Sequence, residues 1–150
     1  MNEQCEQFWL NYCEEAALDA TAQFVRAYRF GDTPDELAQL VATGVKTTTS
    51  HAQKLWMLKQ KRIPMCGDYN IIMNKQYEPM ALIQILKVEI KRYDEIDEAF
   101  AIAEGDGSYE NWDCIHERYY KEQLAMYDEP FSKDIPLLCQ TFQLVKVKQL

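Results

Sequence analysis

The stretch Gly44-Val45-Lys46-Thr47-Thr48-Thr49-Ser50-His51 places one lysine behind a glycine and follows it with four consecutive hydroxyl side chains. Upstream, Thr33 and Pro34 form the start signal of a helix, because threonine caps the first turn and proline suits the first helical position. Gly44 is placed to end that helix in the left-handed conformation. Three successive β-branched threonines then favour an extended backbone. The stretch therefore predicts a helix that ends at Gly44 and leads directly into a strand.

Further elements are predicted on both sides of this stretch. Apolar residues recur every three or four positions near the N-terminus, which predicts a helix over about residues 3–18. A short helix is expected at 53–58, and strands are expected at 69–73, 80–90 and 137–147. Two more helices are expected after the caps Asp94 and Ser108. Strands interleaved with helices predict an α+β domain built on a small mixed or barrel-like sheet.

The composition indicates a single globular domain over residues 1–150, because 47% of the residues are hydrophobic and only five are glycine and five proline. The N-terminus carries acids where a signal peptide carries bases, and no window approaches the roughly 18 apolar residues of a membrane span. We therefore expect a cytoplasmic protein with no membrane partner. The five cysteines are scattered without a CxxC pair, so buried thiols are expected rather than disulfides or a zinc site.

The charges are distributed unevenly along the chain. The net charge of −8 would repel a polyanion if it were spread evenly over the surface. Between Leu37 and Gly67, however, there is no aspartate or glutamate, so all 24 acids lie elsewhere. The bases in this window are Lys46, Lys54, Lys59, Lys61 and Arg62. The window is either a chance gap in an acid-rich composition or a locally positive mouth that attracts an anion.

Two familiar motifs are excluded. A phosphate-binding P-loop needs a glycine immediately before the lysine and another five positions earlier, where this chain has Val45 and Leu40. His116 and Glu117 lack the second histidine of an HExxH zinc site. On one helical stripe with Trp112, His116 can be a hydrogen-bonded core histidine, just as Lys46 can be a solvated lysine at a strand edge.

Three short motifs follow one another along the chain. They are Gly44-x-Lys46-x-x-Thr49 after a capped helix, Gly67-Asp68 opening a strand, and Ala103-Glu104-Gly105 followed by Trp112 and His116. In this order and spacing they resemble the ASCH domain family from about Phe30 to the C-terminus. The resemblance implies a PUA-like β-barrel with flanking helices, to which the helix at about 3–18 is an addition. The family is thought to bind RNA in the cleft below the signature strand. One small branch instead removes the acetyl group from N4-acetylcytidine with a lysine, a threonine and a glutamate.

The resemblance also implies which residues form the site. The catalytic set carried over by motif is Lys46, Thr49 and Glu104. The expected ligand-binding residues are Gly44, Thr47, Thr48, Ser50, Trp112 and His116. The expected contacts to a longer RNA are Lys54, Lys59, Lys61 and Arg62, with Trp56 available for base stacking. The chain departs from the signature at His51, where an arginine is common, so no bidentate grip on phosphate is expected there. No cofactor or metal is expected.

Two chemistries remain open for this set. Residues three apart on a strand point to opposite faces, so Lys46 and Thr49 converge only where a bulge or the strand's start breaks the alternation. If desolvation leaves Lys46 neutral, it can take the proton of Thr49 for attack on an amide carbonyl, while a protonated Glu104 protonates the leaving amine. If the ion pair prevails, Lys46 and Glu104 form a polar pocket for a base.

Binding of an RNA segment or a small nucleoside-type ligand is therefore the preferred hypothesis. An amidohydrolase acting on an N4-acylated cytidine is the alternative. A structural or interaction domain with an unused cleft is a third hypothesis, and it predicts neither turnover nor saturable binding. The first two hypotheses depend on one geometric expectation, which is that Lys46 and Glu104 face each other across a shared cavity.

Overall fold

The computed structural model describes residues 1–31 and 33–149, which form a mixed α+β fold. The strands are β1 (Val25–Tyr28), β2 (Thr48–Ala52), β3 (Tyr69–Met73), β4 (Pro79–Arg92) and β5 (Pro136–Val147). The α-helices are α1 (Glu3–Glu15), α2 (Pro34–Ala42), α3 (Gln53–Leu58), α4 (Glu98–Ala103) and α5 (Tyr109–Ala125), and the short 3-10 helices are η1 (Ala20–Ala22) and η2 (Tyr93–Glu95).

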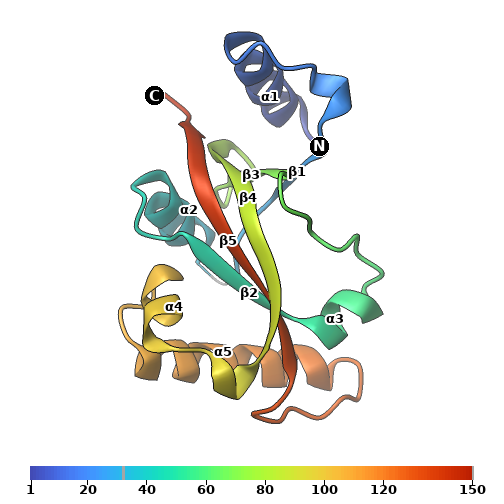
Figure 1. The fold of residues 1–150 in the computed structure, drawn as a ribbon, viewed down its shortest axis with the longest axis vertical. Coiled ribbons are helices and arrows are strands. Elements are labelled where there is room, and N and C mark those ends of the chain that lie inside the picture. The colour runs from blue at the N-terminus through green and yellow to red at the C-terminus, as the bar shows by residue number, and fades with distance from the viewer. Residues whose placement is uncertain (32, 150) are drawn as a thin grey trace.

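The five strands form one sheet in the order β1-β3-β4-β5-β2. β1 runs parallel to β3, and the other neighbouring strands are antiparallel. The long strands β4 and β5 pair along most of their length and run through the middle of the molecule (Figure 1). Within the described residues, the edge strands β1 and β2 each pair with one neighbour only, so the sheet is open. The expected closed barrel is therefore not confirmed.

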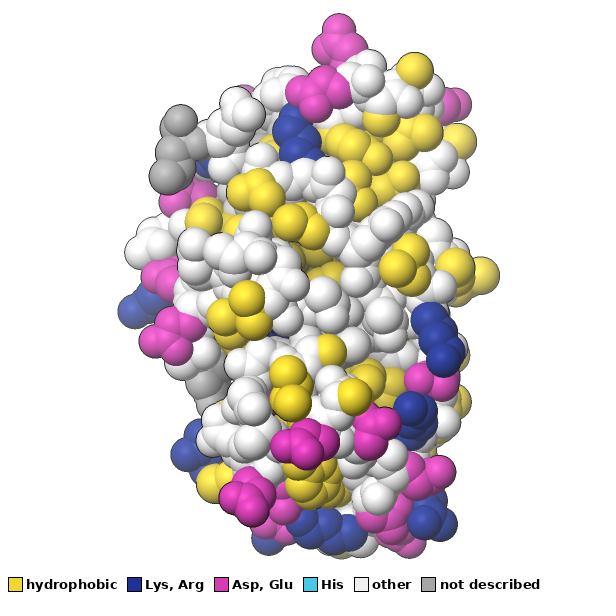
Figure 2. All heavy atoms as spheres, turned by 60° about the vertical axis from the view of Figure 1, so that its left-hand side comes forward, with side chains coloured by type: hydrophobic (Ala, Val, Ile, Leu, Met, Phe, Trp, Pro, Cys, Tyr) yellow, Lys and Arg dark blue, Asp and Glu magenta, His cyan; other side chains and the backbone are white. Residues whose placement is uncertain are grey.

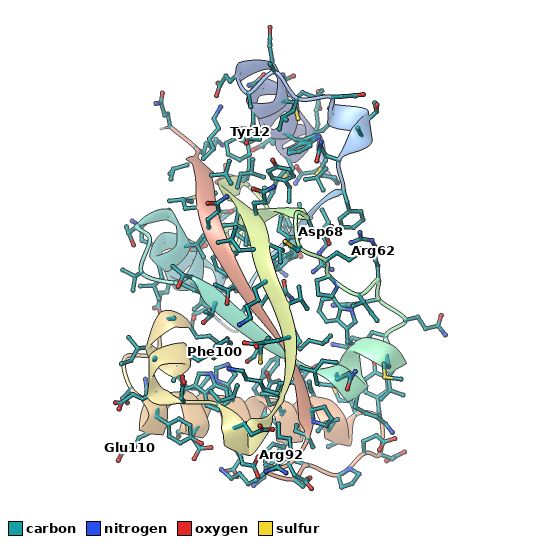
Figure 3. The ribbon with its side chains drawn as sticks, in the orientation of Figure 1. Tyr12, Arg62, Asp68, Arg92, Phe100 and Glu110 are labelled. Atoms are coloured by element: carbon teal, nitrogen blue, oxygen red, sulfur yellow. The ribbon has the colours of Figure 1, made fainter. Side chains whose placement is uncertain are left out.

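The helices cover different parts of this sheet (Figure 1). α1 and η1 lie at the end of the molecule that holds both chain termini, and α4 and α5 lie at the opposite end. At the first end, Trp9 of α1 packs its ring 5.0 Å from that of Tyr69, beside Tyr12 (Figure 3). At the other end, Trp112 and Tyr120 of α5 are almost fully buried. None of the helices in the described part of the chain has the length and apolarity to cross a bilayer.

Several predicted elements are confirmed, and three details differ. The helix at 53–58 and the strand at 69–73 have the predicted bounds. The cap expected at Asp94 is wrong, because Asp94 lies in η2 and the Asp97 carboxylate instead accepts the Phe100 N–H at 2.8 Å. Thr33 occupies the N-cap of α2, but its side chain makes no capping hydrogen bond. The short strand β1 was not predicted.

Candidate functional site

A pocket of about 230 Å³ opens where β2, α5 and the segments before α2 and after α4 meet. We call it the Glu104 pocket. It combines apolar and aromatic walls with several polar side chains. Its lining residues are Phe30, Gly31, Thr33, Leu37, Lys46, Thr49, Ser50, His51, Glu104, Asp106, Ile115, His116, Arg118, Tyr119 and Tyr120.

Lys46 and Glu104 face each other at the wall of this pocket. The Lys46 Nζ lies 3.7 Å from Glu104 Oε1, and both side chains are less than 5% exposed. The ammonium also donates hydrogen bonds to the carbonyl oxygens of Thr48 at 2.8 Å and Glu104 at 3.0 Å. Its third neighbour is the ring of Phe30, whose centroid lies 4.8 Å away. The structure thus brings together the lysine and the carboxylate that lie 58 positions apart in the sequence.

The Glu104 carboxylate is the centre of a buried hydrogen-bond network. Its Oε1 accepts the backbone N–H of Ser50 at 3.0 Å, and its Oε2 accepts the Ser50 hydroxyl at 3.0 Å. Trp112 donates its indole N–H to the same Oε2. The Ser50 hydroxyl also lies 3.1 Å from the Tyr120 hydroxyl. A buried carboxylate with this many donors is held rigidly in one orientation, because each donor would lose its partner if the carboxylate turned.

His116 completes the network on the side of the pocket. Its ring stacks on Trp112, with centroids 4.4 Å apart, because the two residues are one helical turn apart on α5. The Nδ1 lies 2.9 Å from the Trp112 carbonyl oxygen, and the Nε2 lies 3.4 Å from Glu104 Oε2. Asp106 approaches the Nδ1 at 3.8 Å. His116 is thus placed between two carboxylates, where a protonated ring is favoured.

The local backbone explains how Glu104 reaches this position. Gly105 has a φ of +98°, a left-handed conformation that ends α4 directly after Glu104. A Cβ at residue 105 would lie 2.9 Å from Leu40 Cδ1 and 3.7 Å from Lys46 Cβ. The left-handed backbone and the close approach to Leu40 therefore favour glycine at this turn. The Ser108 hydroxyl then caps α5, which carries Trp112 and His116 back toward the pocket.

The ionisation of the network follows from burial and from neighbouring charges. Burial would raise the pKa of Glu104, but the charges of His116 and Lys46 and the Trp112 hydrogen bond lower it to about 2. Burial would lower the pKa of His116, but Glu104 raises it above its ordinary value of 6.5. For Lys46, burial lowers the pKa below the ordinary 10.5, against the opposing effect of the Glu104 and Asp106 carboxylates.

These directions correct one step of the amidohydrolase hypothesis. That hypothesis needs a protonated Glu104 to supply a proton to the leaving amine. The carboxylate is instead held ionised near pH 7, because its pKa is about 2 and all its close partners are donors. His116 is the proton donor that this network offers instead, because Glu104 raises its pKa above 6.5 and so favours the protonated ring.

The predicted residues of the signature strand divide into two groups. Thr49 and Ser50 line the Glu104 pocket, and Lys46 does so from just before β2 begins. Because Lys46 precedes the strand, it escapes the strand's alternation and lines the same pocket as Thr49. Among the hydrogen bonds of the described residues, none joins the Lys46 amine directly to the Thr49 hydroxyl.

Other predicted ligand-binding residues lie outside the pocket lining. Gly44 ends the turn after α2 with a φ of +78°. Thr47 pairs through its backbone with Ala103 and Phe142, and the Thr48 hydroxyl donates to the Phe100 carbonyl. Trp112 is fully buried, so it acts on the pocket through Glu104 rather than as a surface for a ligand.

The predicted basic contacts are also divided. Lys59 and Lys61 line a second pocket beside the first, described below. Lys54 pairs with Glu129 at 3.5 Å, and Arg62 forms a close ion pair with Asp68 (Figure 3). Trp56 is 5% exposed and donates its indole N–H to the Arg62 carbonyl, so it offers little open ring surface for stacking on a base.

Several residues of the pocket were not predicted. Asp106, Ile115, Arg118, Tyr119 and Tyr120 also line it. The sequence does carry a signal for Ile115, Tyr119 and Tyr120, because they recur at helical spacing with Trp112 and His116. Nothing in the local sequence marked Asp106 or Arg118.

Glu104, Asp106 and His116 also offer ligand atoms within 4.8 Å of one another, a spacing that a metal ion could use. Their present interactions favour a different role. Glu104 already accepts hydrogen bonds from Ser50 and Trp112, and the ammonium of Lys46 lies close enough to repel a second cation. The arrangement therefore favours a protonated His116 between the two carboxylates.

Comparisons with known proteins agree with this fold. The sequence pattern of the ASCH domain family matches residues 26–146. The crystal structure of protein EF3133 from Enterococcus faecalis V583 is 35% identical, covers 98% of this chain and 91% of its own, and has a TM-score of 0.88. An ASCH domain from Lactobacillus crispatus JV V101 is 21% identical, covers 96% and 95%, and also has a TM-score of 0.88. A search of curated protein sequences found no match.

Proposed function

Because the chain belongs to the ASCH domain family, which is PUA-like and is proposed to bind RNA, we propose that the Glu104 pocket receives the base of a ribonucleoside. The base is either that of a free nucleoside or one that projects from a short single-stranded RNA. Recognition of an unstacked base needs flat aromatic or apolar surface together with groups that hydrogen-bond its edge.

The lining of the Glu104 pocket is the observation that carries this proposal. Phe30 and Tyr119 supply aromatic surface, and Thr49, Ser50 and His116 supply polar groups along β2 and α5. The Lys46–Glu104 network fixes Ser50 and His116 in place without taking up the pocket itself. Polar groups that are already oriented lose little entropy when a ligand binds, which favours recognition of one base over others.

A pair of isosteric variants tests the proposal. The free protein is titrated with the four ribonucleosides and with a short single-stranded RNA, with calorimetry as the readout. Thr49→Val keeps the shape of the pocket but removes its hydroxyl, so we expect about 2- to 12-fold weaker binding, the usual range for one hydrogen bond. Thr47→Val makes the same change outside the pocket lining and should leave the affinity unchanged. If none of these ligands shows saturable binding, the proposal is contradicted, and a structural or interaction domain is favoured instead.

The salt dependence separates the two forms of the ligand. Contacts to several phosphates release counterions, so the affinity of RNA should fall steeply as the salt concentration rises. An uncharged nucleoside should bind almost equally at low and high salt. An affinity that does not change with salt concentration therefore indicates a nucleoside ligand, and an affinity that falls steeply with salt indicates RNA.

Amide hydrolysis is a second candidate, favoured by two observations. The pKa of Lys46 is lowered, and Lys46 and Thr49 line the same pocket. In this reaction the neutral Lys46 amine takes the proton of the Thr49 hydroxyl, and the alkoxide attacks the amide carbonyl. His116 gives its proton to the leaving amine, and water then cleaves the threonine ester to release the acid. Release of cytidine from N4-acetylcytidine, present with Thr47→Val and lost with Thr49→Val, would support this candidate, and no release would end it.

A further inference from the structure

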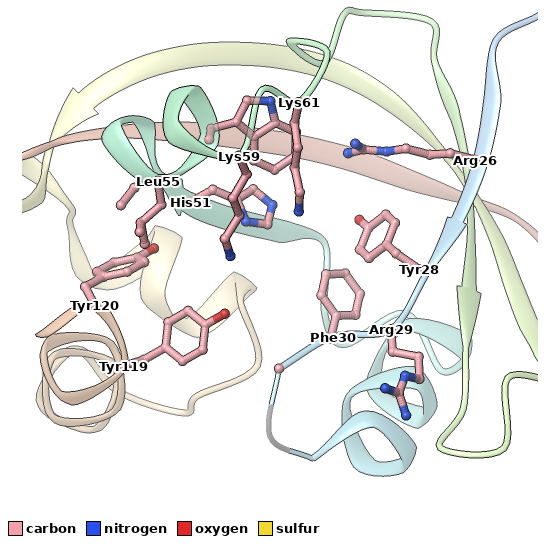
Figure 4. A pocket seen from close by; sticks show the side chains of 13 residues that line it. Arg26, Tyr28, Arg29, Phe30, His51, Leu55, Lys59, Lys61, Tyr119 and Tyr120 are labelled. Atoms are coloured by element: carbon pink, nitrogen blue, oxygen red, sulfur yellow. The ribbon is translucent and has the colours of Figure 1, made fainter. Parts of the chain in front are cut away.

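A second pocket, of about 180 Å³, adjoins the Glu104 pocket. We call it the Lys61 pocket. It is bounded by β1, β2, the segment after α3, and α5 (Figure 4). Phe30, Gly31, His51, Tyr119 and Tyr120 line both pockets, so the two form neighbouring compartments of one cleft. A ligand that fills the first compartment can therefore extend into the second.

The Lys61 pocket is positively charged. Arg26 reaches it from β1, and the amines of Lys59 and Lys61 extend into it from the segment after α3 (Figure 4). No described carboxylate lies within 4.0 Å of any of these three cations. Arg26 donates its Nε to Asn70 Oδ1 at 3.0 Å and lies over the ring of Tyr28, so it is held in place without its charge being neutralised. Arg29 also lines the pocket, but it stacks on Tyr77 and donates to the Lys75 carbonyl. Three cations without carboxylate partners are a notable concentration in a chain of net charge −8.

The surroundings of other basic residues make this concentration stand out. Lys54, on the neighbouring helix α3, pairs with Glu129, and Arg62 pairs with Asp68. On the face shown in Figure 2, acidic and basic side chains lie next to one another over the lower end of the molecule. Basic side chains on this protein thus commonly pair with carboxylates. Among the described residues, the three cations of the Lys61 pocket do not. Cations left unpaired in a concave site are available to an anionic ligand.

Two buried polar atoms of residues that line this pocket also have no partner among the described residues. They are the hydroxyl of Tyr28 and the Nε2 of His51. A buried donor or acceptor without a partner costs free energy, so such atoms in a pocket indicate a ligand that would satisfy them. Tyr28 belongs to β1 and His51 to β2, so the two residues approach the pocket from different strands of the sheet.

We propose that the Lys61 pocket binds a phosphate group of the nucleotide whose base occupies the Glu104 pocket. This inference rests on the function proposed above and narrows the ligand from a nucleoside to a nucleotide. The phosphate belongs either to a free mononucleotide or to the backbone of a short RNA, and its chemistry is the same in both.

The chemistry of the pocket fits a phosphate. Lysine and arginine form charge-assisted hydrogen bonds to phosphate oxygens, and the Tyr28 hydroxyl can donate another. Burial, opposed by Glu104 and reinforced by the charges of Arg26, Lys61 and Lys46, lowers the pKa of His51 to about 3. His51 is therefore a neutral ring near pH 7, which can still donate one N–H.

The test compares matched ligands on matched variants. Each ribonucleoside is titrated against its own 5′- and 3′-monophosphate and against inorganic phosphate, at one low salt concentration. We expect one monophosphate to bind about tenfold or more tightly than its nucleoside, as charge-assisted hydrogen bonds allow. In the double variant Lys59→Ala/Lys61→Ala, the monophosphate should bind no more tightly than the nucleoside, and the affinity for the nucleoside itself should not change. Lys54→Ala removes a charge on the same stretch, outside the pocket lining, and should preserve the ratio.

The outcomes separate this inference from the proposed function. A nucleoside that binds equally well with and without its phosphate overturns the phosphate site but leaves the proposed function standing. A failure of both ligands to bind overturns both. A Lys54→Ala variant that lowers the ratio as much as the double variant also overturns the site, because it shows a general charge effect. If the ratio is present, a pentanucleotide that binds more tightly than the mononucleotide assigns the phosphate to RNA, and equal binding assigns it to a free mononucleotide.

Discussion

In the Glu104 pocket the carboxylate accepts hydrogen bonds from Ser50 and Trp112 and has Lys46 3.7 Å away, whereas in the Lys61 pocket no described carboxylate lies within 4.0 Å of Arg26, Lys59 or Lys61. The first region satisfies its own charges, and its geometry is therefore set before any ligand arrives. Among the described residues, the second leaves three cations without a carboxylate partner and two buried polar atoms without a hydrogen-bond partner. The difference indicates that the first pocket selects by shape and hydrogen bonding, and the second by charge.

The chain has only two histidines: His116 lines the Glu104 pocket, and His51 lies where the two pockets adjoin. His116 lies between the carboxylates of Glu104 and Asp106, and its pKa is raised above 6.5. His51 is buried near Arg26 and Lys61, and its pKa is lowered to about 3. Burial lowers the pKa of both rings, but at His116 the Glu104 carboxylate outweighs burial. At His51 burial prevails over Glu104, and the charges of Arg26, Lys61 and Lys46 reinforce it.

The largest expected effect is therefore the separation of the two histidine titrations. In an NMR titration, we expect the His116 ring signal to shift above pH 6.5 and the His51 signal to shift only as the pH approaches 3, a gap of about three units or more. His116→Gln and His51→Gln assign the signals. Two histidines titrating together near 6.5 would contradict the comparison.

The same shifts predict how stability depends on pH. His116 has a raised pKa, so its contribution is complete below the unfolded-state value of about 6.5 and is lost as the pH rises through the folded-state value. His51 has a lowered pKa, so protonation opposes folding as the pH falls from about 6.5 toward 3. Glu104 adds to this acid sensitivity, because its stabilising charge is lost as the pH falls from about 4.5 toward 2.

Removing the centre of the buried network should have the next largest effect. Glu104→Ala leaves the Lys46 ammonium buried beside unpartnered donors, so the free energy of unfolding should fall by about 3–5 kcal/mol. Urea denaturation followed by tryptophan fluorescence measures this change. Glu129→Ala breaks the exposed pair with Lys54 and should change stability by less than about 1 kcal/mol. Equal effects of the two variants would show that the buried network does not hold the site together.

A smaller effect is expected from Ser50→Ala. This change removes one of the donors to Glu104 and the partner of the Tyr120 hydroxyl, both of them buried. We expect a loss of about 1–3 kcal/mol, with the fold retained, because the backbone N–H of Ser50 still donates to the carboxylate. A change below about 0.5 kcal/mol would indicate that the Ser50 hydroxyl contributes no net hydrogen bond.

The smallest effect on stability is expected in the Lys61 pocket. Tyr28→Phe removes a buried hydroxyl that has no partner among the described residues, so stability should stay the same or rise by about 1 kcal/mol. Binding of a nucleoside monophosphate should nevertheless weaken. A loss of stability in this variant would show that the Tyr28 hydroxyl has a partner in the free protein. That result would contradict the description of this hydroxyl as unsatisfied.

Much of the secondary structure around the site could be predicted from the sequence, because the signals that specify it are local. The helix that ends at Gly44, the strand of threonines and the capped last helix follow from residues that act on their own neighbours. The expectation that Lys46 meets Glu104 came from the family resemblance, and the structure places the two 3.7 Å apart.

The rest depended on contacts between distant segments. β1 has only four residues, too few for a periodic signal, and so the pocket contacts of Arg26 and Tyr28 were missed with it. The ionised state of Glu104 could not be predicted either, since its donors Ser50 and Trp112 come from β2 and α5 and meet only in the folded protein. The burial of Trp56 has the same cause, because its ring is covered by His51, Arg26 and Lys61.

A crystal structure of the protein with the ribonucleoside monophosphate that binds most tightly in titration would test the central claim most directly. We predict a base beside Thr49 in the Glu104 pocket and a phosphate against Lys59 and Lys61 in the neighbouring compartment. A nucleotide bound outside this cleft, or one whose phosphate points toward Glu104, would contradict it.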